Sequence, residues 1–157
     1  MSIYRQKSTV INGTVCSGVQ QAGLFTGLNW VKEQCMQLVG FAPYPGTLNI
    51  RVDGKEFLQW QKWRRETQGL LLTPPNADYR AGMLFPGQLA EIMAAAVLPL
   101  VPGYPEDVIE LIAPVHLRSG LNLEDGDQVA VLLVLKVKLA QKTRSFAFNS
   151  LLNNPQK

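Results

Sequence analysis

The residues that decide the fold run from Asp107 to Val137 and read DVIELIAPVHLRSGLNLEDGDQVAVLLVLKV. The first seven, DVIELIA, form a β-rich run that ends at Pro114, a pattern typical of a short strand. Asp125-Gly126 marks a turn, and the mostly apolar residues 128–137 after it predict a long strand. This part of the chain therefore predicts short strands joined by turns.

Other segments upstream extend the same pattern. The runs 8–16 and 48–52 are rich in Val, Ile, Thr and Leu and end at Ser-Gly and Asp-Gly pairs, which predicts two more strands. Asn29–Val39 is expected to be a helix, with Asn29 as N-cap, Gly40 as C-cap, and Val31, Cys35, Leu38 and Val39 on one face. Residues 81–99 stay open between a helix and two strands. The order of elements indicates a mainly β fold, a small β-barrel with one clear helix inserted.

The composition sets the broad class. The 157 residues are 46% hydrophobic and 17% charged, which is typical of one folded domain and excludes a mainly disordered chain. No apolar run is long enough to span a membrane, and the first residues lack the apolar core of a signal peptide. Two cysteines and one histidine cannot build a cysteine/histidine zinc site. A cytoplasmic protein without a membrane partner is the expectation.

The charge is concentrated near one end. Residues 128–157 hold five Lys or Arg side chains and no acid, although the whole chain carries only +3. A nucleic-acid protein would use such a segment to contact phosphates, and Trp60 and Trp63 beside Arg64 and Arg65 could stack on bases. A solvated tail explains the basic segment as well, and a helical stripe packed on the domain explains Trp60 and Trp63. We favour these two interpretations. Nucleic-acid binding is therefore the weakest of the functional hypotheses.

Several common catalytic motifs are absent from this sequence. No phosphate-binding P-loop, dinucleotide fingerprint or nucleophile elbow is present. The single histidine, His116, and the buried-face cysteine, Cys35, are best interpreted as structural. Three segments remain. The loop from Ser17 to Gly27 could cradle phosphates with its backbone amides.

The other two segments carry polar side chains on strands. Thr47 and Asn49 lie two apart on an expected strand, so their side chains point the same way and could form a neutral oxygen pair for Mg²⁺. A turn in which Asn49 satisfies its own backbone is the alternative. Glu110 could hold a substrate hydroxyl or accept its proton, and Arg118 could bind phosphate. A surface ion pair is the alternative for these two.

Two blocks of sequence carry a family resemblance. GFAPYPGTLNIRV at 40–52 and DVIELIAPVHLRSGLNLEDGDQV at 107–129 resemble the signatures of the CTP-dependent, archaeal-type riboflavin kinases. The resemblance covers most of residues 10–135. It implies a six-stranded cradle-loop barrel over residues 1–137, with strands at 83–90 and 94–98, followed by a basic extension at 138–157.

The resemblance also implies an activity and its residues. The γ-phosphoryl group of CTP would pass to the 5′-hydroxyl of riboflavin, giving FMN and CDP. Thr47 and Asn49 would hold Mg²⁺, and Glu110 would bind the flavin and act as the catalytic carboxylate. The nucleotide would contact two further segments, the loop of Gly18, Val19, Gln20, Gln21, Ala22 and Gly23 and the run of Val115, His116, Leu117 and Arg118.

The sequence departs from the family pattern in three places. Gln20 and Ala22 stand where the nucleotide loop of the family has glycines, so this loop is degenerate. The segment Pro99–Tyr104 replaces a lysine/threonine segment that would contact the flavin, and Ser119 replaces an acid. These changes leave an alternative function open, a non-catalytic barrel that binds a flavin or nucleotide as a regulatory module.

Overall fold

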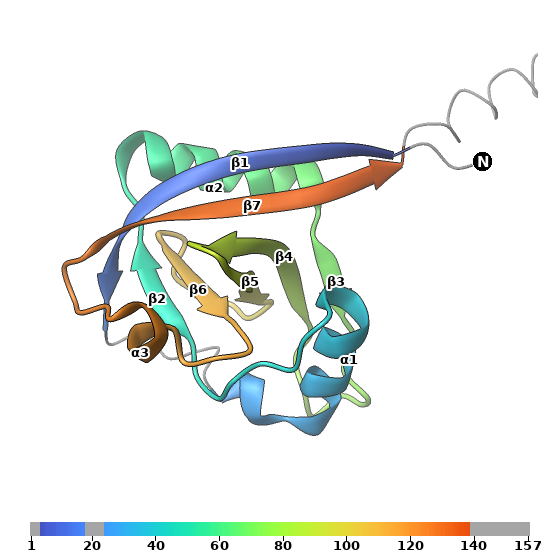
Figure 1. Ribbon diagram of the computed structural model, residues 1–157. Helices are drawn as coiled ribbons and strands as arrows, with labels where there is room; N and C mark the ends of the chain where they lie inside the picture. The colour runs from blue at the N-terminus through green and yellow to red at the C-terminus, as the bar shows by residue number, and fades with distance from the viewer. Residues whose placement is uncertain (1–3, 18–23, 139–157) are drawn as a thin grey trace, which may run out of the picture.

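The computed structural model describes residues 4–17 and 24–138, and its core is an antiparallel sheet curled into a ring (Figure 1). The predicted mainly β class is confirmed. The expected strands at 8–16, 48–52, 83–90 and 94–98 all form, which resolves residues 81–99 as a β-hairpin. The seven strands are β1 (Tyr4–Cys16), β2 (Leu48–Arg51), β3 (Leu70–Leu72), β4 (Gly82–Leu89), β5 (Ile92–Pro99), β6 (Val108–Ile112) and β7 (Gln128–Lys138).

Strand pairing closes the sheet on itself. The order is β3-β4-β5-β6-β2-β1-β7, and an additional pairing joins β4 to β7. Six strands therefore form a barrel-like ring, and β3 is a seventh strand that pairs only with β4. The expected number of six strands is correct for the ring, whereas strand β3 was not predicted.

Glycine permits the closest contacts in this ring. A Cβ atom on Gly87 of β4 would lie 1.9 Å from the carbonyl oxygen of Leu132 on β7, and one on Gly13 of β1 would lie 2.4 Å from Ile50 Cγ2 on β2. Backbones can approach this closely only where no side chain intervenes. Gly87 therefore lets β4 and β7 meet where the ring closes, and Gly13 leaves room for the side chain of Ile50.

The first helix begins and ends where the sequence indicates. Helix α1 spans Asn29–Val39, and Gly40 caps it in the left-handed conformation at φ 85°. Val31 and Cys35 are buried as expected. Two details differ: Leu28 rather than Asn29 is the N-cap residue, and Leu38 is 39% exposed. The short 3-10 helix η1 (Phe25–Gly27) precedes α1.

The structure contains two further α-helices, so the expectation of one clear helix was too low. Helix α2 (Gly54–Thr67) packs against β1, and α3 (Leu117–Leu121) is a short turn of helix before β7. Trp60 and Trp63 on α2 are 2% and 6% exposed. Their indole rings are packed in the core, so the base-stacking hypothesis is wrong and the packed helical stripe is confirmed. None of the helices in residues 4–17 and 24–138 has the length and hydropathy of a membrane span.

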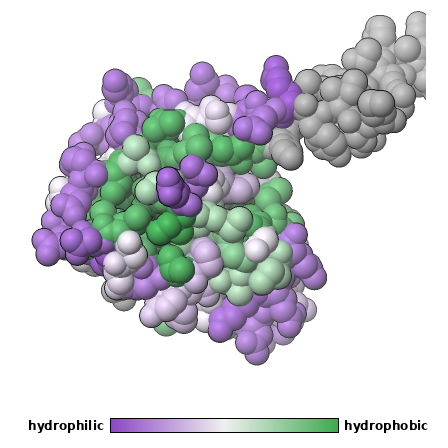
Figure 2. Space-filling model, viewed as in Figure 1, coloured by the Kyte–Doolittle hydropathy of each residue, from purple (hydrophilic) through white to green (hydrophobic). Residues whose placement is uncertain are grey.

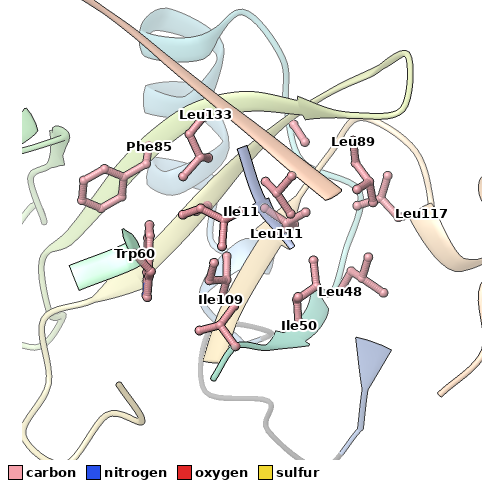
Figure 3. Close-up of a cluster of buried hydrophobic side chains, with 14 of the residues drawn as sticks. Ile11, Leu48, Ile50, Trp60, Phe85, Leu89, Ile109, Leu111, Leu117 and Leu133 are labelled. Carbon is pink, nitrogen blue, oxygen red and sulfur yellow. The ribbon is translucent and has the colours of Figure 1, made fainter. Parts of the chain in front are cut away.

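Alternating side chains divide the interior into two clusters. Inward residues of the ring, such as Ile11, Ile50, Ile109 and Leu111, meet Trp60 in the first cluster, shown in Figure 3. Residues on the other face of β3–β6, including Ile112, pack under η1 and α1 in the second. Polar surface surrounds an apolar centre on the face seen in Figure 2.

The alternation along β6 sets the direction of Glu110. Residues 109 and 111 face the first cluster, so residue 110 must face the other side of the sheet, where the second cluster lies.

Candidate functional site

Thr47, Asn49 and Glu110 come together on neighbouring strands. Asn49 of β2 pairs directly with Glu110 of β6, and Thr47 immediately precedes β2. The Thr47 hydroxyl donates to Glu110 Oε1 over 2.7 Å, and its oxygen lies 3.3 Å from Asn49 Oδ1. Leu48 and Ile50, which alternate with Asn49, are buried in the first core cluster. The apolar residues of β2 therefore direct Asn49 to the opposite face.

This three-residue cluster, Thr47, Asn49 and Glu110, is largely enclosed. Glu110 is 1% exposed and Asn49 is 5% exposed, whereas Thr47 is only half-buried. Burying a carboxylate is costly unless hydrogen bonds compensate. A ligand must therefore reach the cluster from the side of Thr47.

The two oxygens predicted to bind Mg²⁺ are spaced suitably for one ion. Adjacent ligands of an octahedral Mg²⁺ at about 2.1 Å lie about 3 Å apart, close to the 3.3 Å between Thr47 Oγ1 and Asn49 Oδ1. The Thr47 proton is directed at Glu110, which leaves the lone pairs of the hydroxyl for an ion. Within residues 4–17 and 24–138, His, Cys, Asp and Glu form no group of three or more that could hold a metal. Substrate phosphates would have to supply the remaining ligands.

Tyr104 is a member of this site that sequence reasoning missed. Its hydroxyl donates to Glu110 Oε2, the carboxylate oxygen that Thr47 does not contact. Burial, the hydrogen bond to Glu110 and the charge of Glu110 together raise the pKa of Tyr104 far above its ordinary value. Tyr104 lies in the loop between β5 and β6, and no local pattern in the sequence shows where that loop places its side chain.

A pocket adjoins the cluster. It encloses about 90 Å³ and is lined by residues 44–48 at the start of β2, by Leu111 and Ala113, and by residues 115–118. Val115, His116, Leu117 and Arg118, which were predicted to contact the nucleotide, thus share one pocket with Thr47. The His116 ring lies 5.4 Å from the ring of Tyr44 between centroids, and its Nδ1 is 2.6 Å from Ser119 Oγ. Leu117 is mainly a core residue at 5% exposure.

Arg118 is held at the edge of this pocket by neighbouring acceptors. Its Nη2 lies 2.7 Å from Asp125 Oδ1, 3.1 Å from the carbonyl oxygen of Cys16 and 3.2 Å from Ser17 Oγ. A hydrogen bond from Ser17, followed by the bond from Arg118, holds the pKa of the Asp125 carboxyl below its usual range. The surface ion pair weighed for Arg118 is thus present, with Asp125 as its partner. Glu110, for which a surface ion pair was the alternative, is 1% exposed and accepts hydrogen bonds from Thr47 and Tyr104.

The remaining predictions concern the Gly18–Gly23 loop and Cys35. The loop of Gly18–Gly23 lies outside the described residues, but both its flanks reach the site. Ser17 contacts Arg118, and Thr26 of η1 accepts a hydrogen bond from the Gly46 amide over 3.1 Å. Cys35 is fully buried, and this burial raises the pKa of its thiol to about 11. Its interpretation as a core residue is confirmed.

Known proteins with related sequences are riboflavin kinases. A riboflavin kinase of Saccharolobus solfataricus is 35% identical over 134 residues, 83% of this chain and 77% of the relative. One from Ignicoccus hospitalis is 34% identical, covering 81% of this chain and 72% of the relative. One from Archaeoglobus fulgidus is 34% identical over 85% of this chain, which spans only 58% of that longer protein.

A family model gives the same assignment. The model named CTP-dep_RFKase, described as domain of unknown function DUF120, matches residues 15–133. The match includes both signature blocks and every residue of the Thr47–Asn49–Glu110 cluster. Together with relatives above 30% identity over most of the chain, it shows that this protein belongs to the CTP-dependent riboflavin kinase family.

Proposed function

We propose that this protein phosphorylates riboflavin to FMN with CTP as donor and Mg²⁺ as cofactor. The observation that carries the proposal is the cluster itself. Two neutral oxygens with a metal-like spacing lie against a buried carboxylate, and Thr47, which supplies one of them, also lines a pocket together with Arg118. Phosphoryl transfer needs little beyond positioning and neutralised charge, and these groups supply both.

The proposed roles follow from chemistry and position. Thr47 and Asn49 would hold Mg²⁺, which when bound would offset negative charge on the phosphates. Arg118 would contribute a second positive charge from the pocket edge. The Ser17–Gly23 loop would enclose the rest of the nucleotide.

Glu110 would act on riboflavin. Its carboxylate would accept a hydrogen bond from the 5′-hydroxyl and take the proton as the hydroxyl oxygen bonds to the γ-phosphorus. The bond from that phosphorus to the β–γ bridging oxygen breaks at the same time, so CDP leaves and FMN forms. Since Thr47 is the most exposed member of the cluster, both substrates would approach from its side.

The test measures product directly. Incubating the protein with riboflavin, Mg²⁺ and each of the four common nucleoside triphosphates should yield FMN with CTP, detected by chromatography. Asn49→Ala should abolish turnover because it removes one of two protein ligands. Asn29→Ala, at an exposed helix position, is the matched control and should keep full activity.

The same assay separates the proposal from its alternative. If no donor yields FMN, the kinase activity is excluded. Riboflavin or CDP binding measured by calorimetry would then support a non-catalytic barrel, the function that the changed residues Gln20 and Ala22 leave open. If Asn49→Ala turns over normally, Asn49 has no place in the metal site.

A further inference from the structure

Both oxygens of the Glu110 carboxylate accept a hydrogen bond from a hydroxyl on a different segment. Thr47, before β2, donates to Oε1 over 2.7 Å, and Tyr104, in the loop between β5 and β6, donates to Oε2. In both contacts the hydroxyl is the donor and a carboxylate oxygen is the acceptor. Rotating Glu110 would break both bonds, which fixes its carboxylate plane.

Tyr104 is suited to this role by its surroundings. The side chain is partly buried, and Glu110 is 1% exposed, so little water competes for the carboxylate. The pKa of the Tyr104 hydroxyl is raised far above its ordinary value, chiefly by burial and then by Glu110. The phenol therefore keeps its proton at every physiological pH and remains a donor.

The Glu110 carboxylate in turn fixes Thr47. A hydroxyl carries one proton, and the short bond to Glu110 Oε1 takes it, so the Thr47 lone pairs point elsewhere. Asn49 Oδ1 lies 3.3 Å from that same hydroxyl oxygen, and the space between these two oxygens is where the ion would bind. Replacing a group that orients a metal ligand in this way typically lowers metal affinity by about 10–100-fold.

We propose that Tyr104 is a positioning residue for the metal site, holding Glu110 so that Glu110 orients the hydroxyl of Thr47. The inference rests on the proposed metal role of Thr47 and Asn49. It adds a residue from the Pro99–Tyr104 segment, where this chain departs from the family pattern. Tyr104 does not line the pocket that Thr47 and Arg118 share, so it would act through Glu110 and not by contact with the phosphates.

The test compares CDP binding with and without Mg²⁺ by calorimetry. In the wild type, Mg²⁺ should tighten CDP binding. Tyr104→Phe keeps the ring and removes the donor, and it should reduce this tightening by about tenfold, at the lower end of the effect of an indirect ligand contact. CDP affinity in EDTA should stay unchanged. Tyr79→Phe, which removes a hydroxyl from a 40% exposed tyrosine, is the control and should match the wild type.

A double-mutant cycle tests whether Tyr104 acts through Glu110. In a Glu110→Gln background, adding Tyr104→Phe should change the Mg²⁺ effect much less than it does in the wild type. Thermal unfolding of each variant shows that it is folded. If the wild type binds CDP more tightly with Mg²⁺ and Tyr104→Phe does so equally, the role of Tyr104 is excluded. A wild type whose CDP affinity ignores Mg²⁺ overturns the metal site together with this inference.

Discussion

Replacing Thr47 with valine should both destabilise the protein and remove its activity. Valine keeps the branched shape and deletes the hydroxyl that donates to Glu110 Oε1 over 2.7 Å. Since Glu110 is 1% exposed, water cannot easily replace the lost donor. A hydrogen bond to a charged group contributes about 1.5–3 kcal/mol, so the free energy of unfolding should fall by that amount. The melting temperature should drop by roughly 3–12 °C.

The activity of this variant should fall further than its stability. Valine also removes one of the two oxygens proposed to hold Mg²⁺, so kcat/KM for riboflavin should decrease at least about 10–100-fold at temperatures where the variant is folded. Thr47→Ser is the matched control. It retains the hydroxyl and deletes only a methyl group at a half-buried position, so it should keep most of the stability and turnover.

Two assays decide the outcome. Urea unfolding gives the difference in stability, and FMN formation gives kcat/KM. The reasoning is refuted if Thr47→Val is as stable and as active as Thr47→Ser, because the hydroxyl would then serve neither Glu110 nor an ion. A stable but inactive valine variant would keep the metal role and discard the structural role.

Three further predictions concern other parts of the molecule. Asp125→Asn removes the carboxylate that anchors Arg118, which is ionised at neutral pH because the pKa of Asp125 lies below its usual range. The substitution should raise KM for CTP severalfold, and more at low salt. An unchanged KM would count against the role of Arg118. Gly87→Ala would place a Cβ atom 1.9 Å from a carbonyl oxygen of β7. The free energy of unfolding, measured with urea, should therefore fall by about 1–3 kcal/mol or more. An unchanged free energy of unfolding would mean that the β4–β7 contact is loose. Because burial raises the pKa of Cys35 to about 11, iodoacetamide at pH 8 should leave it unmodified in the native state while Cys16 reacts, and equal labelling would contradict its burial.

Much of the β architecture follows from local patterns. The runs at 8–16, 48–52, 107–113 and 128–137 all form strands, because β-branched residues and turn pairs act over a few residues. The hairpin at 82–99 was different. Its alanines favour a helix, and only the family resemblance indicated strands there. Burial between β4, β6 and the core outweighs that preference in the folded protein.

Part of the candidate site could also be predicted from local sequence patterns. The two-residue spacing of Thr47 and Asn49 on a strand is enough to place both side chains on one face. No local rule could pair Asn49 with Glu110, since their contact requires β2 and β6 to become neighbours although 60 residues separate the two positions in the chain. The roles assigned to these residues stay predictions.

The sequence by itself determined the strands at 8–16, 48–52, 107–113 and 128–137, the bounds of α1, and which oxygens share the face of β2, because these properties depend on neighbouring residues alone. Only the tertiary structure decided that β4 meets β7, that Asp125 holds Arg118, and that Tyr104 reaches Glu110. Such contacts form between segments far apart in the chain, and they are selected by the closure of the whole ring and the burial of its core.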